Sequence, residues 1–228
     1  MQSHRYRTDM GDDICVFSSS LKTIAGGYDL LSPSEKLRAE RIRTEVGHSR
    51  FIASRSFLRL AIGEFLGRSP FRDEFISGRF GKLYLSQPNS RVCFNVSHTD
   101  NVVVVACASR RVLGVDIERS DRVVSTSVLR HIYLPEDIER FSSGCDAARA
   151  ALLGWVCKEA VLKCIGCGLS HDPRSIALNW KGMGRPSFRA LEISQKRMIA
   201  REFQMIRIDH IFGVVGAIAL RQLTRAQH

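Results

Sequence analysis

Three short valine-rich segments between Arg91 and Glu118 restrict the fold more than any other part of the chain. They are residues 92–96, 101–108 and 112–117, and turn-forming residues separate them. Valine is enriched in strands because its branched side chain packs well on a pleated, half-buried surface. The first two segments are therefore expected to form a hairpin whose turn is Ser97-His98-Thr99-Asp100, and the third is expected to be a buried strand.

Two helices are predicted before these strands. Ser32-Pro33-Ser34-Glu35 has the serine cap, the early proline and the glutamate typical of a helix start, so the first helix should run to about Val46 and end at Gly47. A second pattern, residues 48–65, places apolar side chains along one stripe and stops before Gly67. The fold is thus expected to open with two consecutive helices.

Helical and strand patterns follow one another in the rest of the chain. Pro135-Glu136-Asp137 predicts another helix start, and residues 147–165 predict a long helix that ends at Gly166. Strands are expected near residues 176–179 and in the terminal segments 203–208 and 211–220. These terminal segments are similar in length and valine content to residues 92–108, which suggests two similar halves, although residue identity does not support a duplication.

The chain is strongly basic, with a formal net charge of +11. Such an excess favours an anionic partner, and composition alone leaves open nucleic acid, a phosphorylated cofactor, an acidic protein or a membrane surface. Several basic residues fall on the first two predicted helices, where either a solvated face or a grip on phosphates would explain them: Lys36, Arg38, Arg41, Arg43, Arg50, Arg55 and Arg59.

The sequence predicts neither export nor a membrane span. The first thirteen residues lack the apolar core of a secretory signal, and the longest apolar runs, 102–108 and 211–220, are too short to cross a bilayer. The seven cysteines are odd in number and irregularly spaced, which argues for reduced thiols rather than a disulfide framework. A soluble, cytoplasmic protein is therefore expected.

Two acidic residues interrupt the third valine-rich segment. Strand alternation places Val115 and Ile117 on one face and the carboxylates of Asp116 and Glu118 on the other. Like charges so close together raise each other's pKa unless a cation lies between them, and magnesium prefers a site with few carboxylates. A strand end that reaches solvent is the other explanation, and spacing alone favours it.

A second set of charged residues lies in the long predicted helix. Helical spacing places Glu159 and Lys163 one turn apart on the same face, beside a buried apolar stripe. An isolated pair of this kind is an ordinary surface ion pair that contributes little to stability.

Three motifs, taken together in order and spacing, resemble the signatures of the 4′-phosphopantetheinyl transferases, and most closely the surfactin-type branch. They are Phe94-Asn95-Val96-Ser97-His98, Gly114-Val115-Asp116-Ile117-Glu118, and Trp155 to Lys163 followed by Gly166-Cys167-Gly168-Leu169. The segment from Leu31 to Arg50 and the pair Gly81-Lys82 are also similar to that branch, so the resemblance covers roughly the whole chain.

The resemblance implies a pseudo-twofold α+β fold. Each half, residues 1–111 and 112–228, would be a small, three-stranded antiparallel sheet packed on a long helix, with coenzyme A held between them. The implied reaction moves 4′-phosphopantetheine from coenzyme A to a serine hydroxyl of an acidic apo carrier protein, acyl, polyketide or peptidyl, and releases adenosine 3′,5′-bisphosphate. A monomer is implied, because one chain supplies both halves.

The resemblance also implies roles for individual residues. Asp116 and Glu118 would bind Mg²⁺, with Mn²⁺ as a possible substitute, and Glu159 would be a third ligand or the general base. Lys163 and His98 would contact the phosphates and act in catalysis. The nucleotide end would be held by four further residues, namely Arg38, Arg50, Lys82 and Ser97.

The chain departs from the family pattern at two positions. Leu83 follows Gly81-Lys82 where the family usually has proline, and this change is expected to matter little. Cys167 stands between two glycines where the family commonly has lysine. The loss of that cation puts in doubt which carrier is favoured, not whether transfer occurs.

Two other functions are open from the residues alone. Cys164-x-x-Cys167 with His171 offers three ligands for a structural zinc ion at a familiar spacing, although a fourth ligand is not evident. The basic charge would also suit a nucleic-acid-binding protein, but no recognisable nucleic-acid module accompanies it. We therefore expect neither zinc nor nucleic acid as a partner.

Overall fold

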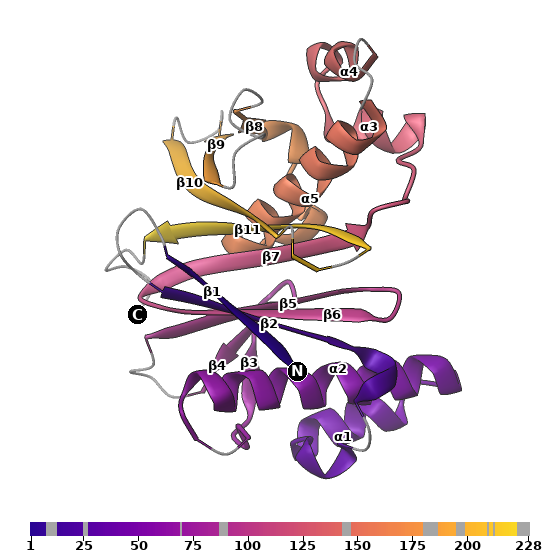
Figure 1. Ribbon diagram of the computed structural model, residues 1–228, viewed down its shortest axis with the longest axis vertical. Coiled ribbons are helices and arrows are strands. Elements are labelled where there is room, and N and C mark those ends of the chain that lie inside the picture. Colours follow the sequence, from indigo (N-terminus) through magenta and orange to yellow (C-terminus); the bar gives the residue numbers. More distant parts are fainter. Residues whose placement is uncertain are drawn as a thin grey trace. The chain divides into compact units, whose positions relative to one another are not determined.

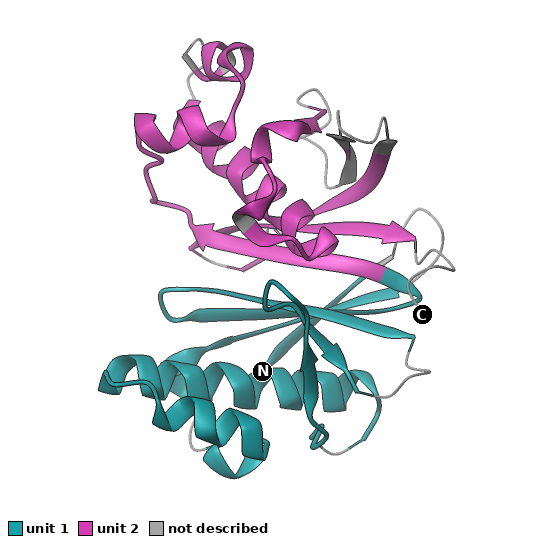
Figure 2. Ribbon diagram, turned by 180° about the vertical axis from the view of Figure 1, so that it is seen from behind, with its two compact units in different colours: residues 1–111, 223–228 teal, residues 112–222 magenta. Residues whose placement is uncertain are grey.

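The chain forms a mixed α+β fold built from antiparallel sheets and helices (Figure 1). The computed structural model describes residues 1–7, 13–24, 27–68, 70–86, 91–142, 147–179, 187–194, 199–208, 210–211 and 213–222. These residues divide into two compact units, one within residues 1–111 and the other comprising residues 112–222 (Figure 2). We call them unit 1 and unit 2.

The described residues of unit 1 form a four-stranded antiparallel sheet in the order β1-β2-β6-β5, a two-stranded sheet of β3 and β4, and two α-helices. Its elements are β1 (Gln2–Arg7), β2 (Asp13–Ser20), α1 (Pro33–Glu40), α2 (Glu45–Phe65), β3 (Phe75–Ser77), β4 (Leu83–Leu85), β5 (Val92–Thr99) and β6 (Val102–Ser109). Because α2 packs on one face of the larger sheet, its apolar stripe and the strands share one core.

The core of unit 1 explains the run of valines in β6. Val103, Val105 and Cys107 lie in the same apolar cluster as Phe57 and Ile62 of α2. The alternate residues of β6, from Val104 to Ala108, are fully buried as well. A strand buried on both faces reads as continuous rather than alternating hydrophobicity.

The described residues of unit 2 form a five-stranded sheet in the order β7-β11-β10-β9-β8, together with three α-helices. Its elements are β7 (Arg111–Arg119), α3 (Thr126–Ile132), α4 (Pro135–Ser142), α5 (Ala147–Ile165), β8 (Ile176–Leu178), β9 (Ser187–Ser194), β10 (Ile199–Ile208) and β11 (Val214–Gln222). The buried stripe of α5 packs against apolar residues of β8 to β11. The predicted long helix is confirmed, and Gly166 follows it with a φ of 80°.

The first helix is shorter than predicted. Its start at Pro33 is confirmed, and the Ser32 backbone N–H donates to Glu35 Oε2 at 3.2 Å, as a capping box requires. It ends at Glu40 rather than near Val46, and Gly47 does not terminate it. Thr44 instead caps α2, because its Oγ1 accepts a hydrogen bond from the Gly47 backbone N–H at 3.3 Å.

The hairpin turn is also shorter than predicted. Ser97, His98 and Thr99 belong to β5 and are paired with Val104, Val103 and Val102. The turn therefore lies at Asp100 and Asn101, and Asp100 adopts the left-handed conformation with a φ of 47°. Aspartate tolerates this conformation better than most residues, which lets the strands continue closer to the turn.

The larger sheets have four and five strands rather than the expected three. In unit 1 the added strands include β1, whose sequence is polar and whose described side chains are exposed or half-buried. In unit 2 the strand predicted near residues 176–179 is confirmed as β8, and β9 is the strand that was not predicted. Among the described helices, none is long and apolar enough to cross a membrane.

Candidate active site

Strand β7 brings Asp116 against helix α5. Asp116 is 6% exposed, and Lys163 Nζ donates a hydrogen bond to its Oδ1 at 2.7 Å. This approach depends on Gly114 two residues earlier. A Cβ atom at Gly114 would lie 2.2 Å from the Ala160 carbonyl oxygen and 2.3 Å from the Cys164 nitrogen. The backbones of strand β7 and helix α5, which carry the residues of the candidate site, are therefore in direct contact at Gly114.

Glu118 lies on the same face of β7 as Asp116, as alternation predicts. Its Oε1 accepts a hydrogen bond from Nη1 of Arg122, which follows the strand. The Arg122 guanidinium also lies over the Trp155 ring of α5, 5.6 Å from the ring centroid. Each member of the acidic pair thus has a cation on it, a lysine on Asp116 and an arginine on Glu118.

Glu159 lies on α5 and responds to both acids of β7. Burial is the largest cause of the raised pKa of Glu159, and the negative charges of Asp116 and Glu118 raise this pKa further. The Lys163 ammonium lowers this pKa and so opposes part of the rise. Three carboxylates and one lysine that were predicted from separate motifs therefore act electrostatically on one another within unit 2.

The donor set of this site suits a hard divalent cation. Carboxylate oxygens are the ligands that Mg²⁺ prefers. Such a cation would also relieve the repulsion that Asp116 and Glu118 exert on the Glu159 carboxylate. In the part of the chain that the structure describes, no three His, Cys, Asp or Glu side chains are arranged to hold a metal ion. The positive charges next to Asp116 and Glu118 are those of the Lys163 and Arg122 side chains.

The predicted nucleotide-end residues lie on several elements of unit 1. Arg50 of α2 pairs with Asp100 in the β5–β6 turn at 3.6 Å, which brings it close to the end of β5. The Arg38 guanidinium lies 5.5 Å from the centroid of the neighbouring Phe51 ring. Lys82 is in the β3–β4 turn. Burial raises the pKa of Cys93 in β5, and the charge of Lys82 opposes part of this rise.

Ser97 and His98 point to opposite faces of β5 because they are consecutive residues of a strand. Ser97 is 4% exposed and opposes Val104, whereas His98 is exposed and opposes Val103 on the α2 side. Since β5 is an edge strand of its sheet, a ligand that touches both side chains would have to lie along that edge.

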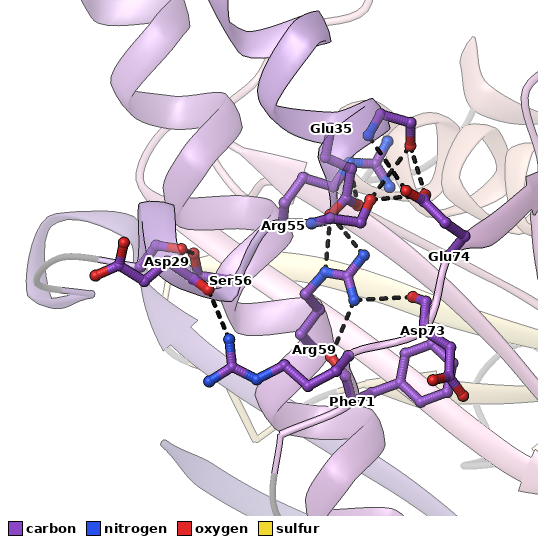
Figure 3. A network of polar contacts seen from close by, with 12 residues as sticks. Asp29, Glu35, Arg55, Ser56, Arg59, Phe71, Asp73 and Glu74 are labelled. Atoms are coloured by element: carbon purple, nitrogen blue, oxygen red, sulfur yellow. Dashed lines mark hydrogen bonds and ion pairs between the residues drawn. The ribbon is translucent and has the colours of Figure 1, made fainter.

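Sequence reasoning missed a buried ion network in unit 1 (Figure 3). Arg59, counted above among cations on a solvated or phosphate-binding face, is fully buried. It pairs with Glu35 Oε2 at 2.7 Å and donates from Nη1 to the carbonyl oxygens of Phe71 and Asp73 at 2.9 and 3.0 Å. Its position among the apolar residues of α2, one residue after Leu58, was the available signal.

Glu74 extends this network to the start of α1. Its carboxylate accepts hydrogen bonds from the hydroxyls of Ser32 and Ser34 at 2.7 and 2.5 Å (Figure 3). These bonds hold the pKa of Glu74 below its ordinary value, with Ser34 as the largest cause. The α1 helix that carries Arg38 is thereby tied to α2 and to the segment before β3.

A second buried cation was missed next to Glu159. Lys158 is 1% exposed and donates to the carbonyl oxygens of Ile132 and Pro173 at 3.1 and 3.0 Å. Burial lowers the pKa of Lys158 to about 8, and the charges of Asp137 and Asp172 oppose this. Lys158 fixes the segments around α5, and its place among apolar residues of the helix, directly after Val156 and Cys157, was the available signal for burial.

The thiols considered for zinc have other partners. Cys164 Sγ donates to the Val112 carbonyl oxygen at 3.4 Å, and Cys167 Sγ donates to the Leu162 carbonyl oxygen at 3.8 Å. His171 Nε2 is 3.1 Å from Ser175 Oγ. Together with the lack of a three-ligand cluster among the described residues, this arrangement favours a packing role for both thiols.

Comparison with known proteins finds one family model that matches within unit 2 and several similar proteins. Residues 112–214 match the model of the 4′-phosphopantetheinyl transferase superfamily. The chain is 32% identical over 145 residues to the 4′-phosphopantetheinyl transferase HetI of Nostoc sp., covering 61% of each protein. It is 29% identical over 154 residues to a phosphopantetheinyl transferase of Thraustochytrium sp., covering 61% of this chain and 54% of that protein.

A fission yeast protein is also similar. Over 175 residues the chain is 27% identical to the L-aminoadipate-semialdehyde dehydrogenase-phosphopantetheinyl transferase of Schizosaccharomyces pombe, with 70% of this chain and 68% of that protein covered. The chain spans less than two thirds of the length of the Nostoc and Thraustochytrium relatives. The predicted resemblance to the superfamily is confirmed over residues 112–214, and the surfactin-type branch stays a prediction.

Proposed function

We propose that the protein transfers the 4′-phosphopantetheine group from coenzyme A to a serine hydroxyl of an apo carrier protein and releases adenosine 3′,5′-bisphosphate. One observation carries the proposal. Asp116 and Glu118 of β7 act electrostatically on Glu159 of α5, and all three lie in the segment that matches the transferase superfamily. Relatives similar to this chain carry the name of this activity.

Glu159 is the residue best suited to take the serine proton. Its raised pKa makes its carboxylate a stronger base than that of an ordinary glutamate. As its carboxylate accepts the proton, the serine oxygen forms a bond to phosphorus. The bond from phosphorus to the oxygen of the departing bisphosphate then breaks. Such phosphoryl transfer depends mainly on positioning and on neutralised charge.

Asp116, Glu118 and Glu159 are the residues that would hold Mg²⁺, or Mn²⁺ in its place. The ion, when bound, would neutralise charge that develops on the diphosphate. Lys163 would contact the phosphates, and its ammonium already lies on Asp116 at the centre of the site.

Unit 1 would bind the nucleotide end of coenzyme A. We propose Arg38, Arg50, Lys82, Ser97 and His98 for this role, with His98 also contacting phosphate. Arg50 and the exposed His98 support this assignment best, because the Arg50–Asp100 pair brings the arginine to the turn that follows β5. The basic charge of the chain suits an acidic carrier protein or carrier domain.

Three further proposals accompany this function. In each unit a long helix packs on an antiparallel sheet, α2 in unit 1 and α5 in unit 2, which supports an ancient duplication. A monomer follows if both units serve one active site. A cytoplasmic location would suit the described thiols, which form no disulfide.

The test is the mass of a carrier protein incubated with the chain, coenzyme A and magnesium. We expect a gain equal to one phosphopantetheine group, and no gain across acyl, polyketide and peptidyl carriers would refute the function. Asp116→Ala should abolish the gain while leaving the protein folded by circular dichroism, because the acidic pair loses its buried member. Near-normal transfer by that variant would refute the role of Asp116.

A further inference from the structure

We propose that Arg122 is a displaceable internal counterion of Glu118, and that a divalent cation binds the acidic pair by taking the place of its guanidinium. This inference rests on the proposed function only in taking Glu118 as a metal ligand. None of the motifs discussed above contains Arg122.

A tight turn after β7 returns Arg122 to Glu118. The Arg122 backbone N–H donates to the Arg119 carbonyl oxygen at 3.1 Å, which closes the turn. Within it, Arg119 binds Asp121 through two hydrogen bonds of 2.8 and 2.5 Å. Asp121 is therefore occupied by another arginine, and the Arg122 side chain is directed to Glu118 and to the Trp155 ring.

The ion pairs of the chain differ in how easily they can open. The side chain of Arg122 is 46% exposed, whereas that of Lys163 on Asp116 is 29% exposed and that of Arg59 on Glu35 is fully buried. Exposed pairs contribute little free energy because water solvates both partners once they separate, whereas a buried pair cannot open without stranding a charge. Of these three cations, Arg122 is the one that can leave at low cost.

Exchange for a metal ion follows from the charges. The guanidinium of Arg122 is hydrogen-bonded to Oε1 of Glu118, whose side chain is 16% exposed, so a metal ion that binds this oxygen would meet a like charge beside it. A divalent cation offers the acidic pair and Glu159 twice the charge of one arginine. Because the Arg122–Glu118 ion pair must open before a metal ion binds, the free energy of that pair is subtracted from the free energy of metal binding. After displacement, the Arg122 guanidinium can remain over the Trp155 ring through its cation–π contact.

Manganese binding tests this exchange without a transfer assay. Free Mn²⁺ would be measured by electron paramagnetic resonance during titration of the wild type, Arg122→Gln and Arg119→Gln. Arg119→Gln is the matched control, because it removes the same charge from the same turn but from a pair with Asp121. We expect Arg122→Gln to bind Mn²⁺ about two- to fivefold more tightly than the control, as expected for an exposed pair.

A double-mutant cycle assigns the effect to Glu118. In a Glu118→Gln background, Arg122→Gln should leave Mn²⁺ affinity unchanged, because its partner has lost its charge. Equal affinities for Arg122→Gln and Arg119→Gln, or the absence of Mn²⁺ binding to the wild type, would overturn the proposal. The carrier-mass assay on the same proteins separates the two ideas, since Mn²⁺ exchange without transfer would refute only the proposed function.

Discussion

The contact at Gly114 predicts that one methyl group will impair the candidate site. In Gly114→Ala the new Cβ would be 2.2 Å from the Ala160 carbonyl oxygen, and ordinary contacts begin near 3.4 Å. Strand β7 and helix α5 must therefore separate by about 1.2 Å, since both neighbouring atoms belong to the backbone. A displacement of this size commonly costs about 100-fold in rate, and overpacking costs about 1–3 kcal/mol of stability.

Two measurements check this prediction. The kcat/KM for carrier modification should fall by about two orders of magnitude, and urea unfolding should show the loss of stability. Gly67→Ala is the control, because Gly67 has a φ of 65° and a Cβ atom there would meet no neighbouring atom within 4 Å. It should lose about 1 kcal/mol through backbone strain and keep its activity. A Gly114→Ala enzyme within threefold of the wild type would show that the strand–helix contact does not position the site.

Two further predictions concern buried charge. The raised pKa of Glu159 means that the folded chain holds this proton more tightly than the unfolded chain, so the ionised carboxylate costs stability at neutral pH. Glu159→Gln should therefore lose transfer activity yet unfold at higher urea concentration at pH 7.5. This gain should vanish as the pH falls through the raised pKa, and a gain independent of pH would contradict the reasoning. Arg59→Met leaves Glu35 buried without its closest partner and should cost about 3–5 kcal/mol in urea unfolding. Glu35→Gln combined with Arg59→Met should recover part of that loss, and a double variant no more stable than Arg59→Met would argue against the ion pair as the cause.

Local signals predicted the parts of the fold that local forces determine. The capping residues of α1 were recognised because Ser32 and Glu35 satisfy backbone groups within one turn. The opposite placement of Ile117 and Asp116 followed from the period of a strand. Strand β1 was missed because it is a polar edge strand, and such strands show no apolar alternation to detect.

Long-range pairing explains what the sequence did not predict at the site. Lys163 was expected beside Glu159, one turn away on α5, and its hydrogen bond goes to Asp116, which is 47 residues distant. Arg122 on Glu118 was not foreseen, because the turn after β7 could not be read from residue types alone. The three carboxylates were grouped only because their motifs resembled one family, since each motif alone also fitted a solvated surface.

The shared use of Glu35 has a consequence for how this chain can change over evolutionary time. One carboxylate closes the capping box of α1 and neutralises the buried guanidinium of Arg59. Loss of Arg59 would leave Glu35 with only the more distant Arg55, at 3.8 Å, and loss of Glu35 would remove the carboxylate that pairs with the buried Arg59, so a change at either position alone is expected to be costly. We expect these two positions to covary among related sequences, changing together or remaining together.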